Sequence, residues 1–320
     1  MFPHEILKIP PSGVPSAALR HRGRDHTFAT SFRFQWRSLT VFLAKGLIVI
    51  IKPVLSVATT LILLAGIGAA RAGVVCTLVI DSQDGASLLE SGDCDSRVTP
   101  ASTFKVALAA IGFEEGILAG PHAPVWTYAK GEVDWGGEPW RGDVDPAWWM
   151  KYSVVWYSQR MARKLGAARL EDRARSIGYG NADFSGDPGK DNGLERAWIA
   201  SSLKISPREQ TRFLRGLLSR SLPLSEAAMA QAEGIVESVE PGAGWRMAGK
   251  TGGAYPRRAD GSFDRARGHG WFVGWAQKGT RRVVFARLAQ DESGERGSPG
   301  IRARKALLAQ WPELAARFAR

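Results

Sequence analysis

Residues 106–113 constrain the fold of this chain more than any other segment. They read Val-Ala-Leu-Ala-Ala-Ile-Gly-Phe and are apolar at nearly every position. A helix that is apolar all round has no face for water, so it belongs in the centre of a sizeable fold. With 320 residues the chain is long enough to bury such a core. The sequence therefore predicts a central helix that begins close to Ser102.

The first turn of this helix contains a serine and a lysine, Ser102 and Lys105. Their spacing of three places both side chains on one helix face. Burial would lower the pKa of the lysine, and a neutral amine beside a hydroxyl is a base beside a nucleophile. The alternative is an ordinary N-cap serine followed by a solvated lysine. Spacing alone does not decide between them, since Ser201 and Lys204 have the same spacing.

The net charge of +12 is unevenly distributed along the chain. Residues 1–72 contain nine Lys or Arg against Glu5 and Asp25, so they account for +7 of the total. The remaining basic residues are scattered and form no run interleaved with aromatic residues. This distribution argues against a nucleic-acid partner.

Residues 1–72 are predicted to be an N-terminal extension that ends in a signal peptide. Val54–Ala65 is an apolar segment of suitable length, and Ala70-Arg71-Ala72 is a small-x-small cleavage site. We therefore expect cleavage near Ala72, a mature domain over 73–320, and a periplasmic protein with no stable membrane association. The alternative is an uncleaved membrane anchor, because residues 41–51 are also apolar.

The two cysteines, Cys76 and Cys94, lie on either side of a predicted β-hairpin. Val74–Asp81 and Ala86–Glu90 are predicted as its strands, with the turn at Asp84-Gly85. Because the turn lies midway between the cysteines, folding brings them together. A disulfide there would stabilise an exported protein by about 3 kcal/mol. Two free buried thiols are the alternative.

Strands are predicted at both ends of the mature chain and helices between them. The predicted C-terminal strands are Trp245–Thr251, Gly270–Ala276 and Arg281–Leu288. The predicted helices after the central one are 153–165, Pro207–Arg220, Glu226–Val236 and Ile301–Gln310, the last ended by Pro312. This order predicts an α+β fold, in which the hairpin and the C-terminal strands form one antiparallel sheet flanked by helices, with a separate all-helical lobe.

Four polar motifs follow one another along this predicted fold. They are Ser102-x-x-Lys105, Ser153-Val154-Val155, Tyr179-Gly180-Asn181 and Lys250-Thr251-Gly252, and Trp271-Phe272-Val273-Gly274-Trp275 comes after them. The set resembles the penicillin-recognising serine enzymes. Ser-x-Val and Tyr-Gly-Asn make it similar, within that group, to the class D β-lactamases of the oxacillinase type. The resemblance extends from Gly73 to Trp311 and implies the penicillin-recognising fold.

The resemblance implies catalytic roles for four of these residues. Ser102 would attack the β-lactam carbonyl and become acylated. Lys105 would be carboxylated by CO₂ or bicarbonate and act as general base, with no diffusible cofactor and no metal. Ser153 would relay a proton to the lactam nitrogen in the field of Lys250. The reaction implied is the hydrolysis of penicillins and oxacillin-type β-lactams through a serine acyl-enzyme.

The same resemblance implies a set of residues that surround the substrate and the carboxylated lysine. Val155 would keep the lysine dry, and the indole of Trp198 would hydrogen-bond its carboxyl group. The backbone N–H groups of Ser102 and Gly253 would form the oxyanion hole. The remaining substrate contacts implied are Thr251, Gly252 and Arg304, with Arg302 as the second candidate for the arginine.

Other activities are less consistent with the sequence. A metal-dependent hydrolase is disfavoured because no His-x-x-Glu-His motif or paired cysteine motif is present. The main alternative is a β-lactam sensor domain, which is acylated without turnover, and a cell-wall transpeptidase is the third candidate. The expected partner is a small-molecule β-lactam substrate. The protein is expected to be a monomer or a homodimer.

Overall fold

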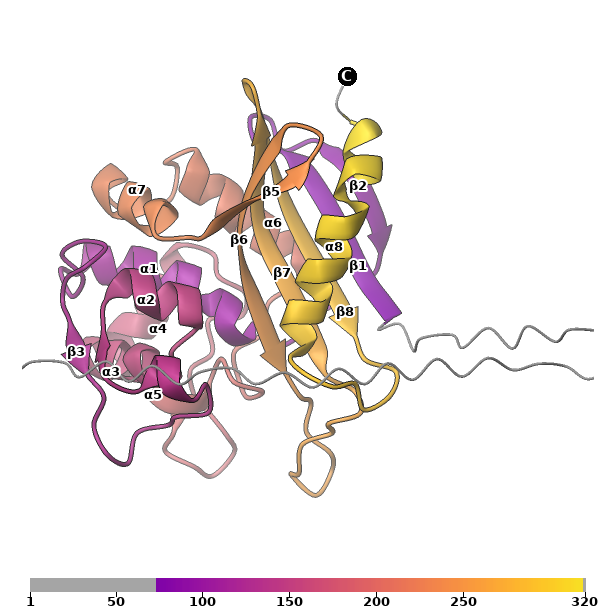
Figure 1. Ribbon diagram of the computed structural model, residues 1–320. Helices are drawn as coiled ribbons and strands as arrows, with labels where there is room; N and C mark the ends of the chain where they lie inside the picture. The colour runs from indigo at the N-terminus through magenta and orange to yellow at the C-terminus, as the bar shows by residue number, and fades with distance from the viewer. Residues whose placement is uncertain (1–72, 319–320) are drawn as a thin grey trace, which may run out of the picture. The chain divides into compact units, whose positions relative to one another are not determined.

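The computed structural model describes residues 73–318, so the predicted extension and signal peptide over 1–72 lie outside the described residues. A six-stranded antiparallel sheet with the order β2-β1-β8-β7-β6-β5 forms the main layer (Figure 1). Its strands are β1 (Gly73–Asp81), β2 (Ser87–Gly92), β5 (Ser238–Gly242), β6 (Trp245–Ala254), β7 (His269–Lys278) and β8 (Arg281–Gln290). Within residues 73–318, the hairpin strands β1 and β2 join β6, β7 and β8 in one sheet, as predicted, and β5 is an additional strand that was not predicted.

The N-terminal hairpin is attached to the sheet through β1, which pairs with both β2 and β8. Cys76 lies in β1 and Cys94 follows β2, and the two form a disulfide. Both cysteines are buried. The prediction of a disulfide across this hairpin is therefore confirmed.

Helix α8 (Pro299–Ala316) covers one face of the sheet and α6 (Pro207–Leu218) covers the other (Figure 1). The predicted end of the C-terminal helix at Pro312 is wrong, because α8 continues through this residue. A proline inside a helix costs about 3 kcal/mol. The packing of Trp311 against Trp245, Phe285 and Phe318 offsets this cost, since these rings form the buried core between α8 and the sheet.

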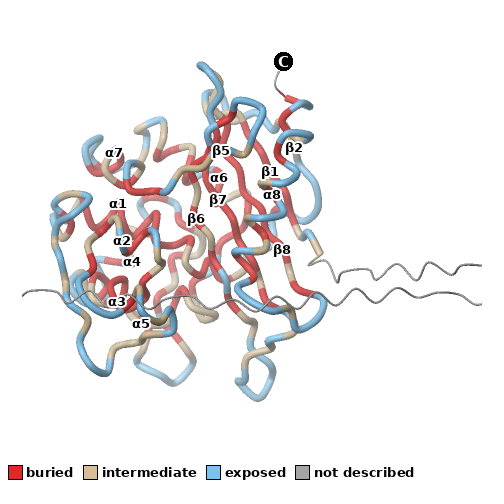
Figure 2. Tube along the Cα trace, viewed as in Figure 1, coloured by how far each residue is buried: buried red, intermediate tan, exposed pale blue. Residues whose placement is uncertain are grey.

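The helical lobe is built around α1 (Phe104–Glu114). All residues of α1 from Phe104 to Phe113 are buried, which confirms the predicted central helix (Figure 2). A 3₁₀ turn, Ala101–Thr103, precedes α1. The other lobe elements are β3 (Trp126–Thr127), β4 (Asp143–Val144), α2 (Pro146–Tyr152), α3 (Val155–Leu165), α4 (Ala167–Ser176), α5 (Gly193–Arg196) and α7 (Glu226–Gly234).

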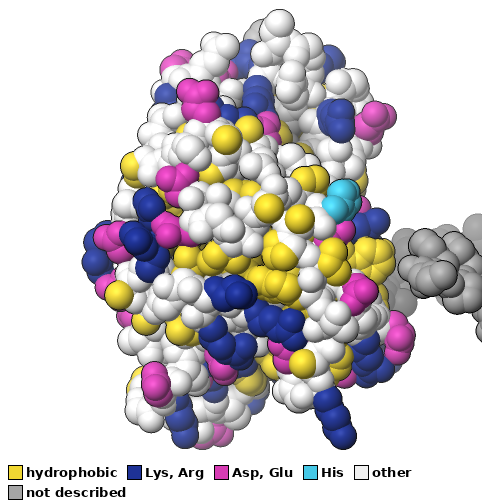
Figure 3. Space-filling view, turned by 90° about the vertical axis from the view of Figure 1, so that its left-hand side faces the viewer, with side chains coloured by type: hydrophobic (Ala, Val, Ile, Leu, Met, Phe, Trp, Pro, Cys, Tyr) yellow, Lys and Arg dark blue, Asp and Glu magenta, His cyan; other side chains and the backbone are white. Residues whose placement is uncertain are grey.

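The outer face of the helical lobe shows a band of hydrophobic side chains with Lys and Arg gathered beside it (Figure 3). Among the exposed apolar side chains of the lobe is Val125, and Lys164 lies over the ring of Trp126 next to it. Within residues 73–318, none of the helices combines the length and the apolar character that crossing a membrane would require.

Candidate active site

Ser102 lies in the 3₁₀ turn that leads into α1, at the boundary between the helical lobe and the sheet. The turn is closed by Thr103, whose hydroxyl donates to the carbonyl of Pro100 at 2.7 Å. Gln210 of α6 donates to the same hydroxyl, also at 2.7 Å. Ala101 has a φ of 50°, in the left-handed region that a residue with a side chain rarely adopts. The serine is thus held in a fixed turn, with strain beside it.

Lys105 lies beneath Ser102 with only 1% of its surface exposed. Its Nζ is 3.5 Å from the Oγ of Ser102. Burial lowers the pKa of the Lys105 amine well below its usual value, and the positive charge of Lys250 lowers it further. Both causes favour the neutral form of the amine, and a neutral amine beside a hydroxyl is a base beside a nucleophile.

An aromatic cluster surrounds Phe104, the residue directly before Lys105. The ring of Phe104 lies within 5.6 Å, centroid to centroid, of the rings of Tyr179, Phe184 and Trp198. Tyr179 is buried, and its hydroxyl accepts a hydrogen bond from Gln210 at 3.5 Å. The Tyr-Gly-Asn motif thus supports the nucleophile turn from behind, through ring packing and through Gln210.

Lys250 approaches the same point from β6 and is 5% exposed. Its Nζ donates to the carbonyl of Thr251 at 3.2 Å. Burial lowers the pKa of this amine to about 8; the carboxylate of Glu237 opposes the shift and Arg304 reinforces it. At neutral pH this lysine is still largely cationic, so its positive charge acts on the Lys105 amine.

Glycines allow β6 to approach the nucleophile turn this closely. A Cβ on Gly252 would lie 2.7 Å from the carbonyl oxygen of Pro100, and a Cβ on Gly300 would lie 2.5 Å from the carbonyl oxygen of Gly252. The strand is therefore in backbone contact with the nucleophile turn on one side and with the start of α8 on the other. This contact explains why Gly follows Lys-Thr in the motif.

Ser153 connects α2 to α3 and has a φ of 62°. The predicted helix start at Ser153 is displaced by two residues, because this left-handed residue caps α2 and α3 begins at Val155. The preceding carbonyl, that of Tyr152, accepts a hydrogen bond from the indole of Trp140 at 2.9 Å. The serine is thus presented by a fixed reversal between two helices.

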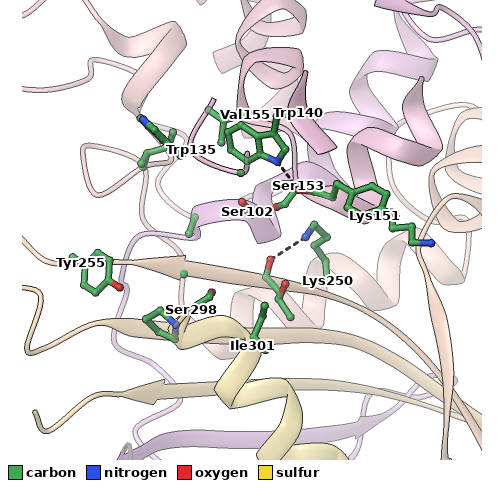
Figure 4. Close-up of a pocket in the computed structure, with 17 residues that line it drawn as sticks. Ser102, Trp135, Trp140, Lys151, Ser153, Val155, Lys250, Tyr255, Ser298 and Ile301 are labelled. Atoms are coloured by element: carbon green, nitrogen blue, oxygen red, sulfur yellow. Dashed lines mark hydrogen bonds between the residues drawn. The ribbon is translucent and has the colours of Figure 1, made fainter. Parts of the chain in front are cut away.

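These elements enclose a cavity of about 580 Å³ (Figure 4). The side chains of Ser102, Ser153 and Lys250 converge on one part of it (Figure 4). The sequence-predicted residues that line it are Ser102, Ser153, Val155, Lys250, Thr251 and Gly253. The other lining residues are Ala101, Trp135, Gly136, Trp140, Lys151, Tyr152, Ile199, Tyr255, Ser298, Pro299 and Ile301.

The other predicted site residues are not among those that line this cavity. Trp198 packs on Phe104, and Gly252 lies against Pro100. Arg304 lies on α8 with its guanidinium 5.9 Å from the ring of Phe272, where its charge acts on Lys250. Arg302, the second candidate for the arginine, pairs with the buried carboxylate of Asp291 at 2.5 Å.

Several lining residues were not predicted individually. Tyr255 lies just beyond β6, and its signal was its position two residues after Gly253. Ile301 lies on the first turn of α8, which begins two residues before the predicted start of this helix, and no motif pointed to Ile301 as a lining residue. Lys151 and Tyr152 directly precede Ser153, so proximity to the motif was the only available signal.

Known proteins with similar sequences identify the family to which this chain belongs. The profile of the penicillin binding protein transpeptidase domain matches residues 75–310. The β-lactamase OXA-9 of Klebsiella pneumoniae is 40% identical over 239 residues, which are 75% of this chain and 87% of the relative. The chain belongs to the class D β-lactamases. The predicted family and class of enzyme are therefore confirmed.

The crystal structure of the class D β-lactamase OXA-427 agrees with the fold of this class D β-lactamase. It has a TM-score of 0.70 and 40% identity, and the match covers 76% of this chain and 98% of that one. The predicted α+β fold is confirmed.

The sensor alternative has weaker support than the β-lactamase. The regulatory protein BlaR1 of Bacillus licheniformis is 29% identical over 208 residues, which are 63% of this chain but 31% of that protein.

Among residues 73–318 no group of three or more His, Cys, Asp or Glu is placed to hold a metal ion.

Proposed function

We propose that this class D β-lactamase hydrolyses penicillins and oxacillin-type β-lactams through an acyl-enzyme on Ser102. The observation that carries the proposal is the buried Lys105 amine, whose pKa is lowered by burial and which lies 3.5 Å from the hydroxyl of Ser102, beside a cavity that Lys250 also lines. A buried base withdraws the hydroxyl proton as the serine oxygen attacks the lactam carbonyl. The lactam C–N bond then breaks, and Ser153 relays the proton taken from Ser102 from the base to the lactam nitrogen. Water activated by the same base then cleaves the acyl ester, which releases the opened product and restores the Ser102 hydroxyl.

The oxyanion formed in this step needs donors, and the backbone of β6 supports Gly253 in this role. The N–H of Gly249 donates to the carbonyl of Glu237 at 3.3 Å, on the side of β6 that faces β5. Because N–H groups alternate between the two edges of a strand, the N–H of Gly253 points to the same edge. The N–H of Ser102 lies at the start of a helix, where N–H groups have no partner within the helix. We assign the oxyanion hole to these two groups.

The site is suited to a carboxylated Lys105. CO₂ adds to a neutral amine, and burial favours the neutral form of this amine. The positive charge of Lys250, which disfavours a cationic Lys105, would stabilise an anion at the same place. Carboxylation would supply an anionic oxygen as the general base for both acylation and deacylation. Val155 and Trp198 would exclude water around the carboxylated lysine, consistent with their positions at the cavity wall and on Phe104.

The substrate carboxylate is assigned to Lys250, Thr251 and Arg304. Lys250 and Thr251 line the cavity, and Arg304 acts on the same region by charge. Gly252 contributes through the backbone contact that brings β6 to Ser102.

Purified protein is expected to turn over a chromogenic cephalosporin repeatedly, and bicarbonate is expected to raise the rate. A ¹³C signal from labelled bicarbonate that disappears in Lys105→Ala would identify the carboxylated lysine. A single stoichiometric burst that leaves a stable acyl-enzyme would contradict hydrolysis and support the sensor alternative.

We further propose that residues 1–72 are removed on export and that 73–320 function in the periplasm. The disulfide between Cys76 and Cys94 is consistent with an oxidising compartment. N-terminal sequencing of the exported protein is expected to begin at Gly73, whereas an intact N-terminus in the membrane fraction would support the anchor.

Light scattering is expected to show a monomer or a homodimer.

A further inference from the structure

A second cavity of about 620 Å³ adjoins the catalytic one. Trp135, Ile199, Gly253 and Tyr255 line both cavities, so the two share a wall. Trp135 and Tyr255 lie at the side of the catalytic cavity away from Lys250 (Figure 4). The second cavity is also lined by Arg196, Ala200, Ala254, Phe263 and Arg265.

Aromatic rings and guanidinium groups alternate along this second cavity. The guanidinium of Arg196 lies 6.0 Å from the ring of Trp135 and 5.8 Å from the ring of Phe263. The guanidinium of Arg265 lies 5.4 Å from the ring of Tyr255. These contacts hold both cations against flat apolar surfaces.

Neither arginine has a carboxylate partner of its own. Within residues 73–318 no carboxylate oxygen lies within 4.0 Å of Arg196 or Arg265, while the nearby Asp187 is paired with Arg257 at 2.9 Å. Burial lowers the pKa of Arg196, and the charge of Asp187 only partly opposes this shift. Two guanidinium groups therefore face a cavity whose lining, among residues 73–318, includes no carboxylate.

We propose that this cavity is a subsite for the acyl side chain of the substrate, and that Arg196 and Arg265 select β-lactams whose aryl side chain carries a second carboxylate. The inference rests on the proposed function. An acyl group on Ser102 with its oxygen at Gly253 has its side chain next to the shared wall. Trp135, Tyr255 and Phe263 offer faces for an aryl ring, and a carboxylate would supply the missing counter-ion.

Two penicillins that differ only in this carboxylate test the subsite: benzylpenicillin and its α-carboxy derivative. In Arg196→Gln and Arg265→Gln the kcat/KM for the α-carboxy derivative is expected to fall about tenfold, as for the loss of one charge-assisted hydrogen bond. The kcat/KM for benzylpenicillin is expected to change less than threefold. Arg212→Gln is the matched control, because it removes the same charge from an exposed position outside both cavities.

Equal losses for the two penicillins in the Arg196 and Arg265 variants would overturn the subsite. If the unchanged protein hydrolyses neither penicillin, the proposed function fails instead. The subsite then remains testable by calorimetry on the full chain with Ser102→Ala, which cannot be acylated. Preferential binding of the α-carboxy derivative that is lost on adding Arg196→Gln would support it, and equal Kd values for both penicillins would contradict it.

Discussion

The segments Ser102–Lys105 and Ser201–Lys204 have the same Ser-x-x-Lys spacing and opposite environments. Lys105 lies on a buried helix with 1% of its surface exposed, whereas Lys204 is exposed in a segment that is not helical. The backbone N–H and carbonyl of Lys204 both bond to Asn181. The second segment thus holds the Tyr-Gly-Asn motif in place. Reactivity at the first segment is therefore a property of burial and helix geometry, and the spacing alone does not produce it.

The largest difference between the segments is expected from the serines. Ser102→Ala should lower kcat/KM for a chromogenic cephalosporin by at least about 10⁴-fold, because no acyl-enzyme can form. Ser201→Ala should leave the rate within about threefold, as is usual for a residue that contacts no reacting group. Intact-protein mass spectrometry should find no acyl adduct on the first variant. An adduct of normal yield would remove Ser102 as the nucleophile.

The lysines are expected to differ nearly as much. Lys105→Ala should slow deacylation by about 10³-fold, in the range that general-base catalysis provides, and should abolish any effect of bicarbonate. Lys204→Ala should retain both the rate and the bicarbonate effect. Single-turnover kinetics separates the acylation and deacylation steps. Normal turnover by Lys105→Ala would contradict its role as a base.

The backbone contact around the first segment gives the next prediction. Gly252→Ala would place a Cβ 2.7 Å from the carbonyl oxygen of Pro100, so β6 must move away from Ser102. A displacement of this kind is expected to lower kcat/KM about 100-fold. Gly234→Ala is the matched control, because a Cβ there meets nothing within 4 Å. Comparable rates in the two variants would show that the contact is dispensable.

The smallest predicted effect concerns the pH dependence of kcat/KM. Lys105 can act as a base or take up CO₂ only without its ammonium proton, so activity should fall when acidification protonates it. Lys250 must be charged, and its pKa of about 8 places the loss of this charge on the alkaline side. One pH unit above that pKa about nine-tenths of the amine is neutral, so kcat/KM should fall about tenfold.

Lys250→Arg should move this alkaline limb to higher pH, because a guanidinium keeps its proton. Lys204→Arg should leave the whole profile unchanged. An alkaline limb near pH 8 that persists in Lys250→Arg would assign it to another group.

The sequence predicted what depends on local pattern and on motif order. The all-apolar α1, the hairpin with its disulfide, and strands β6 to β8 were foreseen because their periodicity or turn residues are explicit. Strand β5 was missed because Ser-Val-Glu-Pro-Gly shows no alternation and contains a proline. The end of α8 was misplaced because the burial of Trp311 is a tertiary effect.

The candidate site divides in the same way. Ser102, Ser153 and Lys250 could be found because each belongs to a motif. Gln210, which joins Thr103 to Tyr179, could not, since it lies in an ordinary amphipathic helix and acquires its role from packing. The proximity of Arg196 and Arg265 could not be predicted either, because only the fold brings these two residues to one wall.

The left-handed residues beside the cavity have a consequence for how this protein can be altered. Ala101 and Ser153 each hold a conformation that costs of order 1–3 kcal/mol. Together with two buried amines, they concentrate unfavourable free energy at the place where acylation occurs. A deep mutational scan selected for heat tolerance alone should therefore enrich glycine or asparagine at 101 and 153 and apolar residues at 105. The same scan selected for antibiotic survival should reject these substitutions, and the positions where the two selections disagree would outline the catalytic centre without any structural input.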